Sequence, residues 1–344
     1  MPAAKSFWLC NAVSSCEGLI RVTSGRLYFH NSAVNLPNVD MVVDGVDSKV
    51  EVPAVDVYLR DLVMDGGSTY KQSSNRLHLR NLTFNDATKI ETSVSWIYIA
   101  DTLLVSNETT DVTCAAPITN NGTFPRLVKK GAAKFNITNN HSDQRMDRGA
   151  EIFGGTVVMG STHSSYKPEI AISAQAVPVK IHAGGTLDMR ACEKPVKFTT
   201  LEVEAGGTIL ANAANVIQCS GDMTFTGAQP FTFAGTINCS GKASFDLTGA
   251  AAPAGDANIT LLSAGTIVGL EAADVEVAGA PAGYEVVVTT KGIFLTKDTS
   301  SIVVAPETKI WTLGGSYVYG STYCFRAPLA QSLSAEGWNV KMTG

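Results

Sequence analysis

Apolar positions alternate with polar or aromatic ones in a short pattern that the chain repeats. Residues 57–64 (VYLRDLVM) recur 20 residues later as 77–84 (LHLRNLTF), and again 20 residues later as 97–104 (IYIADTLL). Residues 34–41 (VNLPNVDM) form an earlier copy, 23 residues before the first. Alternation with a period of two is typical of a β-strand with one buried face, and a repeat of this length is typical of one coil of a solenoid.

Each copy carries an Asp or Asn near its centre, where one strand would turn into the next. These corner residues are Asn38, Asp61, Asn81 and Asp101. Short polar side chains tolerate the left-handed backbone of a sharp corner, and they can form a hydrogen-bonded ladder when they stack in register. We interpret this column as architectural rather than catalytic, because it recurs in every coil.

The second half of the chain repeats a glycine–threonine pair followed by an aliphatic residue. The pairs begin at Gly155, Gly185, Gly207, Gly235 and Gly265. Glycine can supply a bend and the β-branched residues can start a strand, so irregular steps fit coils of constant core with outer loops of varying length.

These repeats predict an all-β fold, a single-stranded right-handed parallel β-helix. Coils of 20–25 residues over residues 20–297 would give about twelve coils, and parallel crossovers are right-handed by strong preference. Residues 1–19 are predicted to form an N-terminal cap, and residues 298–344 a C-terminal cap or the start of a short extra module. The segment 329–338 is the one plausible short helix.

Composition narrows the classes of partner. Charged residues make up 17% of the 344 residues and the net charge is −5 without a dense basic run, which disfavours nucleic acid. No apolar stretch is long enough for a transmembrane helix. Residues 1–5 lack the core of a signal peptide, which leaves three alternatives: a signal removed from this sequence, another export route, or no export.

Seven cysteines suggest two disulfide candidates. Cys10 and Cys16 are close enough to close a small terminal loop, and Cys219 and Cys239 hold equivalent places in neighbouring coils. The alternative for the second pair is two small buried thiols in a core ladder. No cysteine or histidine spacing fits zinc, so we expect neither a metal nor another cofactor.

The second half resembles the β-helix regions of bacterial surface and secreted proteins of the autotransporter-passenger type, with adhesin-like repeats. The residues that carry the resemblance are 118–124 (ITNNGTF), 182–187 (HAGGTL), 204–209 (EAGGTI), 259–269 (ITLLSAGTIVG), 280–284 (APAGY) and 292–296 (GIFLT). The resemblance covers roughly residues 115–297. It implies a stalk or adhesive scaffold at the cell surface or outside the cell.

Enzymes that cleave polysaccharides often use this architecture, and they would need clustered carboxylates. The predicted coil alignment places Asp40 beside Val63, and Asp65 beside Val42 and Asn85, so no column of carboxylates is expected. The densest run of ionisable residues, 141–151, is predicted to be a solvated polar loop. Within it, Asp143 and Asp147 are the first candidates if the chain is an enzyme.

One outward column is the candidate binding site. Tyr58, His78 and Tyr98 occupy the same position in three coils, and Arg60 and Arg80 lie beside them. Aromatic faces next to guanidinium donors can stack against sugar rings. The alternative is cross-strand packing that stabilises the sheet without any ligand.

The sequence therefore favours an extracellular structural or adhesive β-helix that binds glycan or surface partners without turnover. The first alternative is a polysaccharide lyase or glycoside hydrolase with its site on the loop at 139–151. The second is a viral or phage fibre subunit or a self-assembling filament, with trimeric or end-to-end association.

Overall fold

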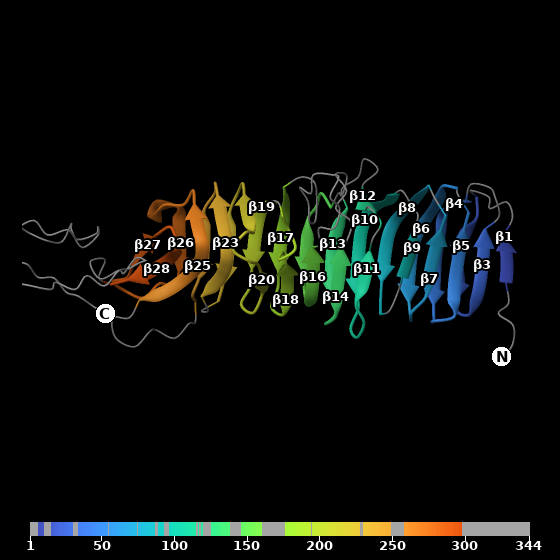
Figure 1. Ribbon diagram of the computed structural model, residues 1–344, viewed down its shortest axis with the longest axis horizontal. Coiled ribbons are helices and arrows are strands. Elements are labelled where there is room, and N and C mark those ends of the chain that lie inside the picture. The colour runs from blue at the N-terminus through green and yellow to red at the C-terminus, as the bar shows by residue number, and fades with distance from the viewer. Residues whose placement is uncertain are drawn as a thin grey trace, which may run out of the picture.

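The computed structural model describes residues 6–9, 15–29, 34–53, 55–73, 75–86, 89–92, 96–114, 116, 118–119, 125–137, 146–159, 176–193, 195–227, 230–248 and 258–297. Their strands stack along one long axis as an elongated parallel β-solenoid (Figure 1), which confirms the predicted fold class. The described part of the chain contains one 3-10 turn, η1 (Ala272–Asp274), and no helix in it is long and apolar enough to cross a membrane. The predicted helix at 329–338 and the segment 298–344 lie outside the described residues, and the handedness stays a prediction.

One wall of the solenoid is a ten-stranded parallel sheet to which each coil from β1 to β20 contributes one strand. Its strands are β1 (Ser6–Leu9), β3 (Gly25–Phe29), β5 (Ser48–Val52), β7 (Thr69–Gln72), β9 (Lys89–Thr92), β11 (Val112–Cys114), β14 (Lys134–Ile137), β16 (Gly155–Met159), β18 (Gly185–Asp188) and β20 (Thr208–Leu210). Later coils lie outside this sheet, and the described solenoid has slightly fewer coils than the predicted twelve or so. The pairing begins at β1, within the segment predicted to be an N-terminal cap.

The remaining strands form the other walls. They are β2 (Glu17–Val22), β4 (Val34–Asp44), β6 (Val57–Asp65), β8 (Arg76–Phe84), β10 (Trp96–Ser106), β12 (Ile118–Thr119), β13 (Arg126–Lys130), β15 (Ala150–Ile152), β17 (Val177–Ile181), β19 (Val196–Val203), β21 (Val216–Cys219), β22 (Met223–Thr226), β23 (Phe231–Cys239), β24 (Ala243–Asp246), β25 (Ile259–Val268), β26 (Val275–Ala278), β27 (Glu285–Val288) and β28 (Gly292–Thr296). The antiparallel pairs among the described strands all involve β28, which pairs with β25 and with β27. The parallel ladder of the described strands therefore ends at β28.

A single apolar core runs along the axis inside these walls. Met41, Leu62 and Leu82 are register partners in consecutive coils, and each is 0% exposed. The strands bury every second residue as the alternating pattern predicts, because side chains of a strand point to opposite faces. Burial of these stacked apolar columns is the main source of stability.

The corner column differs from the prediction in its first and last members. Asp40, not Asn38, is the register partner of Asp61, and Thr102, not Asp101, is the partner of Asn81. In the first coil, three residues, Pro37 among them, lie where the next coil has Arg60 alone. Proline has no N–H for the ladder, so a bulge at this position is expected. It shifts all residues after it relative to the predicted alignment.

The bulge also overturns the prediction that carboxylates do not stack. Asp40 pairs with Asp61 rather than with Val63, and Asp44 rather than Val42 pairs with Asp65. Neighbouring coils relieve this repulsion by supplying donors. Asn81 Nδ2 donates to Asp61 Oδ1 at 2.8 Å, and Asn85 Nδ2 donates to Asp65 Oδ2 at 3.0 Å, so the expected polar ladder exists.

The glycine–threonine pairs fall into two separate stacks. Gly155, Gly185 and the pair at 207–208 stack in the ten-stranded sheet as expected. The pairs at 235–236 and 265–266 stack with each other instead, in β23 and β25, and β23 pairs with β21 rather than with β20. The wall is therefore interrupted after β20.

The cysteine prediction has a partial answer. Cys219 and Cys239 are register partners in neighbouring coils, and both are buried free thiols, so the core-ladder alternative describes them. Cys16 is free and exposed. Its predicted partner, Cys10, lies outside the described residues.

Lys129 is a lysine inside the core. Its side chain is 0% exposed, and its Nζ donates to the carbonyls of Gly131 at 2.8 Å and Gly154 at 3.4 Å and also to that of Lys130. Burial lowers its pKa from 10.5 to about 8, against the attraction of nearby carboxylates. The folded protein therefore binds this proton less tightly than the unfolded chain does.

We expect the stabilisation that Lys129 provides, relative to Lys129→Met, to grow as pH rises from about 8 to about 10.5. A group with a depressed folded pKa gives stability that rises with pH across this window, here by roughly 3 kcal/mol. Urea unfolding of both proteins at pH 7 and pH 10 measures the difference. Lys130→Met, at the exposed neighbour, is the control. A difference that is the same at both pH values would contradict the expectation.

Candidate functional site

The structure brings the three predicted aromatic residues into one row. Tyr58, His78 and Tyr98 are register partners on β6, β8 and β10. The ring centroids of Tyr58 and His78 are 4.3 Å apart at an interplanar angle of 8°, and those of His78 and Tyr98 are 4.7 Å apart at 6°. Strand spacing of about 4.8 Å nearly equals the stacking distance of aromatic rings, so the rings lie face to face along the axis.

This stacking changes what the row can offer to a ligand. Both faces of His78 are covered by tyrosine rings, and the guanidinium of Arg76 lies over the Tyr98 ring, 5.8 Å from its centroid. A sugar ring cannot pack on those covered faces. The row presents ring edges instead, including the hydroxyl groups of Tyr58 and Tyr98, for which no described residue serves as a hydrogen-bond partner.

His78 keeps the row uncharged at neutral pH. Burial lowers its pKa and Arg76 lowers it further, although the charge of Asp56 opposes the shift. Its Nε2 atom is buried and has no hydrogen-bond partner among the described residues. The imidazole is thus packed between the two tyrosine rings in its neutral form.

The two arginines beside the row differ in their freedom. Arg60 forms a bidentate ion pair with Asp40, with Nε–Oδ1 at 2.6 Å and Nη2–Oδ2 at 2.5 Å. This hydrogen bonding holds the pKa of Asp40 below its usual value. Arg80 is exposed and has no ion pair with any residue that the structure describes. Arg60 is thus fixed in the wall, whereas Arg80 has no such partner among the described residues.

A shallow groove of about 370 Å³ runs over the row. It is lined by Pro37, Asn38, Tyr58, Leu59, Arg60, His78, Leu79, Arg80 and Ala100. Four of the five predicted site residues therefore line this groove. The fifth, Tyr98, is stacked on His78 just outside the lining. None of the lining residues is a carboxylate, so the groove holds no acid–base pair for hydrolysis.

Sequence reasoning missed a second cluster, farther along the solenoid. Glu151, Lys180 and Glu202 are register partners on β15, β17 and β19. His182 Nδ1 lies 3.0 Å from Glu204 Oε1, and His182 Nε2 lies 3.8 Å from Glu151 Oε2. The Phe153 ring stacks on His182 at 4.0 Å. The sequence did carry a sign of this cluster: ionisable residues two positions apart, at 180 and 182, recur one coil later at 202 and 204.

The carboxylates of this cluster are held by cations. Lys180 Nζ is 3.0 Å from Glu202 and 3.4 Å from Glu204, and Arg126 Nη1 is 3.4 Å from Glu151. Burial acts to raise the pKa of Glu204, but His182, the Ala183 N–H and Lys180 outweigh it, so the pKa lies below its ordinary value. A carboxyl group that acts as a general acid at neutral pH needs a raised pKa, and that of Glu204 is lowered. We therefore interpret the cluster as an ion-paired network.

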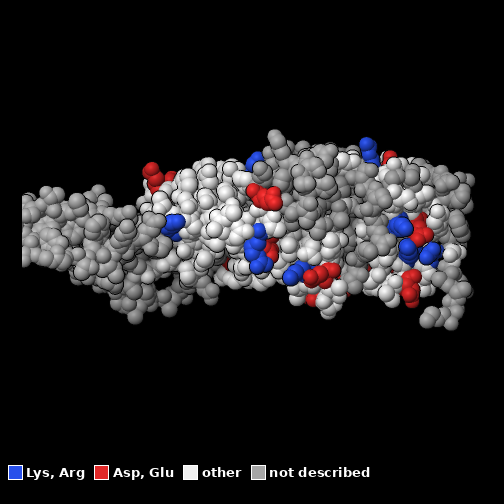
Figure 2. Space-filling model, in the orientation of Figure 1, with Lys and Arg blue, Asp and Glu red and all other residues white. Residues whose placement is uncertain are grey.

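Figure 2 agrees with this local pairing: on the face in view, acidic and basic side chains lie next to one another rather than in patches of one sign. Of the predicted polar loop, Asp143 lies outside the described residues, and Arg148 forms an ion pair with Asp101. No group of three or more His, Cys, Asp or Glu that could hold a metal occurs in the described ranges.

No protein-family model matches this chain, and no curated protein is significantly similar to it. The resemblance to bacterial autotransporter passengers stays a prediction. The structure supports the parallel β-solenoid fold that this resemblance implies.

Proposed function

We propose that this chain is an extracellular, non-enzymatic scaffold whose groove over Tyr58 and His78 holds a glycan or another surface ligand. The observation that carries the proposal is the guanidinium of Arg80 beside the tyrosine hydroxyl groups on parallel strands, none of which has a polar partner among the described residues. The sheet fixes the backbone positions from which these side chains extend, which reduces the reorganisation that binding requires.

The groove favours a ligand that offers hydrogen-bonding groups rather than flat apolar faces. Because both faces of His78 and the inner faces of the two tyrosine rings are already stacked, phenol hydroxyls and Arg80 offer the main contacts. A guanidinium pairs best with a carboxylate or another planar anion. We therefore favour an acidic glycan among surface ligands.

The two alternatives have less support. A polysaccharide-cleaving enzyme would need clustered carboxylates. The groove lining has none and the cluster around His182 has its carboxylates in ion pairs, whereas residues 139–145 of the loop that would carry the site lie outside the described residues. Release of reducing sugar from a polysaccharide panel would overturn the non-enzymatic proposal. A fibre subunit would be a trimer or a filament, which a mass measurement in solution distinguishes from a monomer.

We expect Arg80→Ala to weaken binding of an acidic glycan, identified on a glycan array, by at least about 10-fold, because a charged hydrogen bond is lost. Arg21→Ala is the matched control, since Arg21 is an exposed arginine on β2 outside the groove. The double variant Tyr58→Phe and Tyr98→Phe keeps the stacked rings and removes both hydroxyls. It should also weaken binding, and full retention of affinity in both variants would remove the groove as the binding site.

A further inference from the structure

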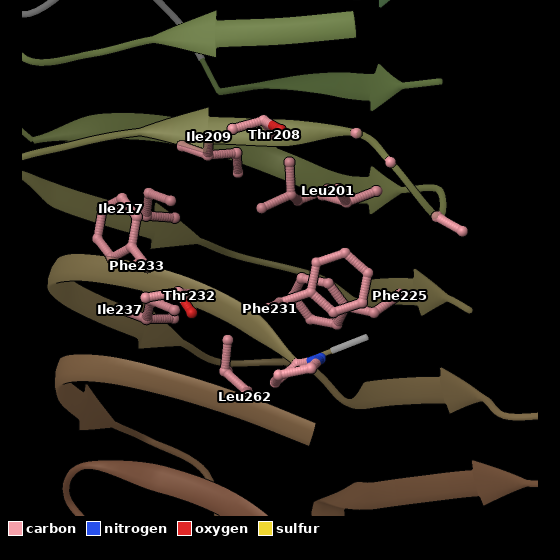
Figure 3. A pocket seen from close by; sticks show the side chains of 15 residues that line it. Leu201, Thr208, Ile209, Ile217, Phe225, Phe231, Thr232, Phe233, Ile237 and Leu262 are labelled. Atoms are coloured by element: carbon pink, nitrogen blue, oxygen red, sulfur yellow. The ribbon is translucent and has the colours of Figure 1, made fainter. Parts of the chain in front are cut away.

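The wall that carries the ten-stranded sheet has a gap after β20. β20 pairs with β18, whereas residues 231–233 of the next coil pair with residues 262–264 of β25. β20 and β23 face each other across the gap (Figure 3), and none of the described strands continues the hydrogen-bond ladder between them. Elsewhere along this wall, each strand from β1 to β20 closes the core by pairing with the next.

A cavity of about 240 Å³ opens at this gap and reaches the solenoid core. Its apolar lining includes Leu201, Ile209, Ile217, Phe225, Phe231 and Phe233. The rings of Phe225 and Phe231 are 4.7 Å apart and tilted by 43°. Figure 3 shows the side chains of β20 on one side of the cavity and those of β23 on the other.

The chemistry of the lining selects a neutral occupant. None of its fifteen residues is ionisable, and its side-chain polar groups are the hydroxyls of Thr208 and Thr232 on exposed residues. A charged molecule entering this space would lose its hydration without gaining a counter-charge.

We propose that this cavity is a binding site for a neutral, largely apolar molecule of one or two rings. An apolar protein cavity of roughly 150 Å³ is large enough to bind benzene. The larger volume here accommodates a fused two-ring molecule, and tilted phenylalanine rings provide edge-to-face contacts with it. The hydroxyls at the rim can accept a hydrogen bond from one polar group such as an indole N–H.

Calorimetric titration of the full chain with indole tests the proposal. Ile209 is half-buried and lines the cavity, so Ile209→Phe fills it, and we expect this variant to bind indole at least about 10-fold more weakly. Ile259→Phe is the control, because Ile259 is a half-buried isoleucine on β25 that does not line the cavity. The Ile259→Phe variant should bind indole as tightly as the wild-type protein does. Indole-3-acetate, which is charged, should bind more weakly than indole.

Thermal unfolding establishes whether each variant is folded. If Ile209→Phe does not fold, Phe231→Ala enlarges the same cavity and should shift the preference from indole towards naphthalene by about fivefold or more. Absence of saturable indole binding to the wild-type chain overturns the proposal. Equal binding by Ile209→Phe, or an unchanged preference in Phe231→Ala, overturns it as well.

Discussion

Gly149→Ala should lower the free energy of unfolding by about 4 kcal/mol or more, because two costs coincide at this buried position. The φ angle of Gly149 is +80°, and a Cβ added there would lie 1.7 Å from the carbonyl oxygen of Pro178 on β17. The backbone of Gly149 also accepts a hydrogen bond from the Leu127 N–H at 2.9 Å. Alanine would thus force apart coils that these contacts hold together.

Gly184→Ala isolates the cost of the backbone angle alone. Its φ angle is +83°, nearly the same, but an added Cβ would meet no atom within 4 Å. We expect a loss of about 1 kcal/mol for Gly184→Ala. Thermal unfolding should show a decrease in Tm of about 5 °C or more for Gly149→Ala and a much smaller one for the control. Similar decreases for both variants would mean that the close approach to Pro178 does not determine the effect.

The constant period of the first half made much of the fold and part of the site predictable. Tyr58, His78 and Tyr98 are separated by 20 residues each, and the structure pairs them as that period requires. The alignment failed at Pro37, where a bulge adds residues without changing the apolar pattern on either side. A bulge of this kind leaves both flanking strands intact, so hydrophobic periodicity alone cannot locate it.

The sequence could predict neither the orientation of the aromatic rings nor the gap in the ten-stranded wall, for different reasons. The column of aromatic residues was evident, but whether rings offer faces or edges depends on their rotamers, and here stacking hides the faces. The pairs at 207–208 and 235–236 have the same residues, yet they lie in different stacks. Identical local sequence therefore concealed the gap after β20, because hydrogen-bond pairing depends on the length of the intervening loops.

Register itself can be tested with one adjacent pair of residues on β6. Leu62 is 0% exposed and lies between Met41 and Leu82, whereas Val63 points outward and is half-buried. We expect Leu62→Ala to lower the free energy of unfolding by about 3 kcal/mol, since it removes buried carbons and leaves a cavity in a column that neighbouring coils cannot refill. Val63→Ala should cost less than about 1 kcal/mol.

Urea unfolding of the two variants measures this contrast. A slip of one residue in strand register would exchange the faces of the whole strand, so it would reverse the order of the two effects. Equal losses would mean that β6 is buried on both faces. The larger loss at Leu62 is therefore a direct measure of the inward column that follows the corner residue Asp61.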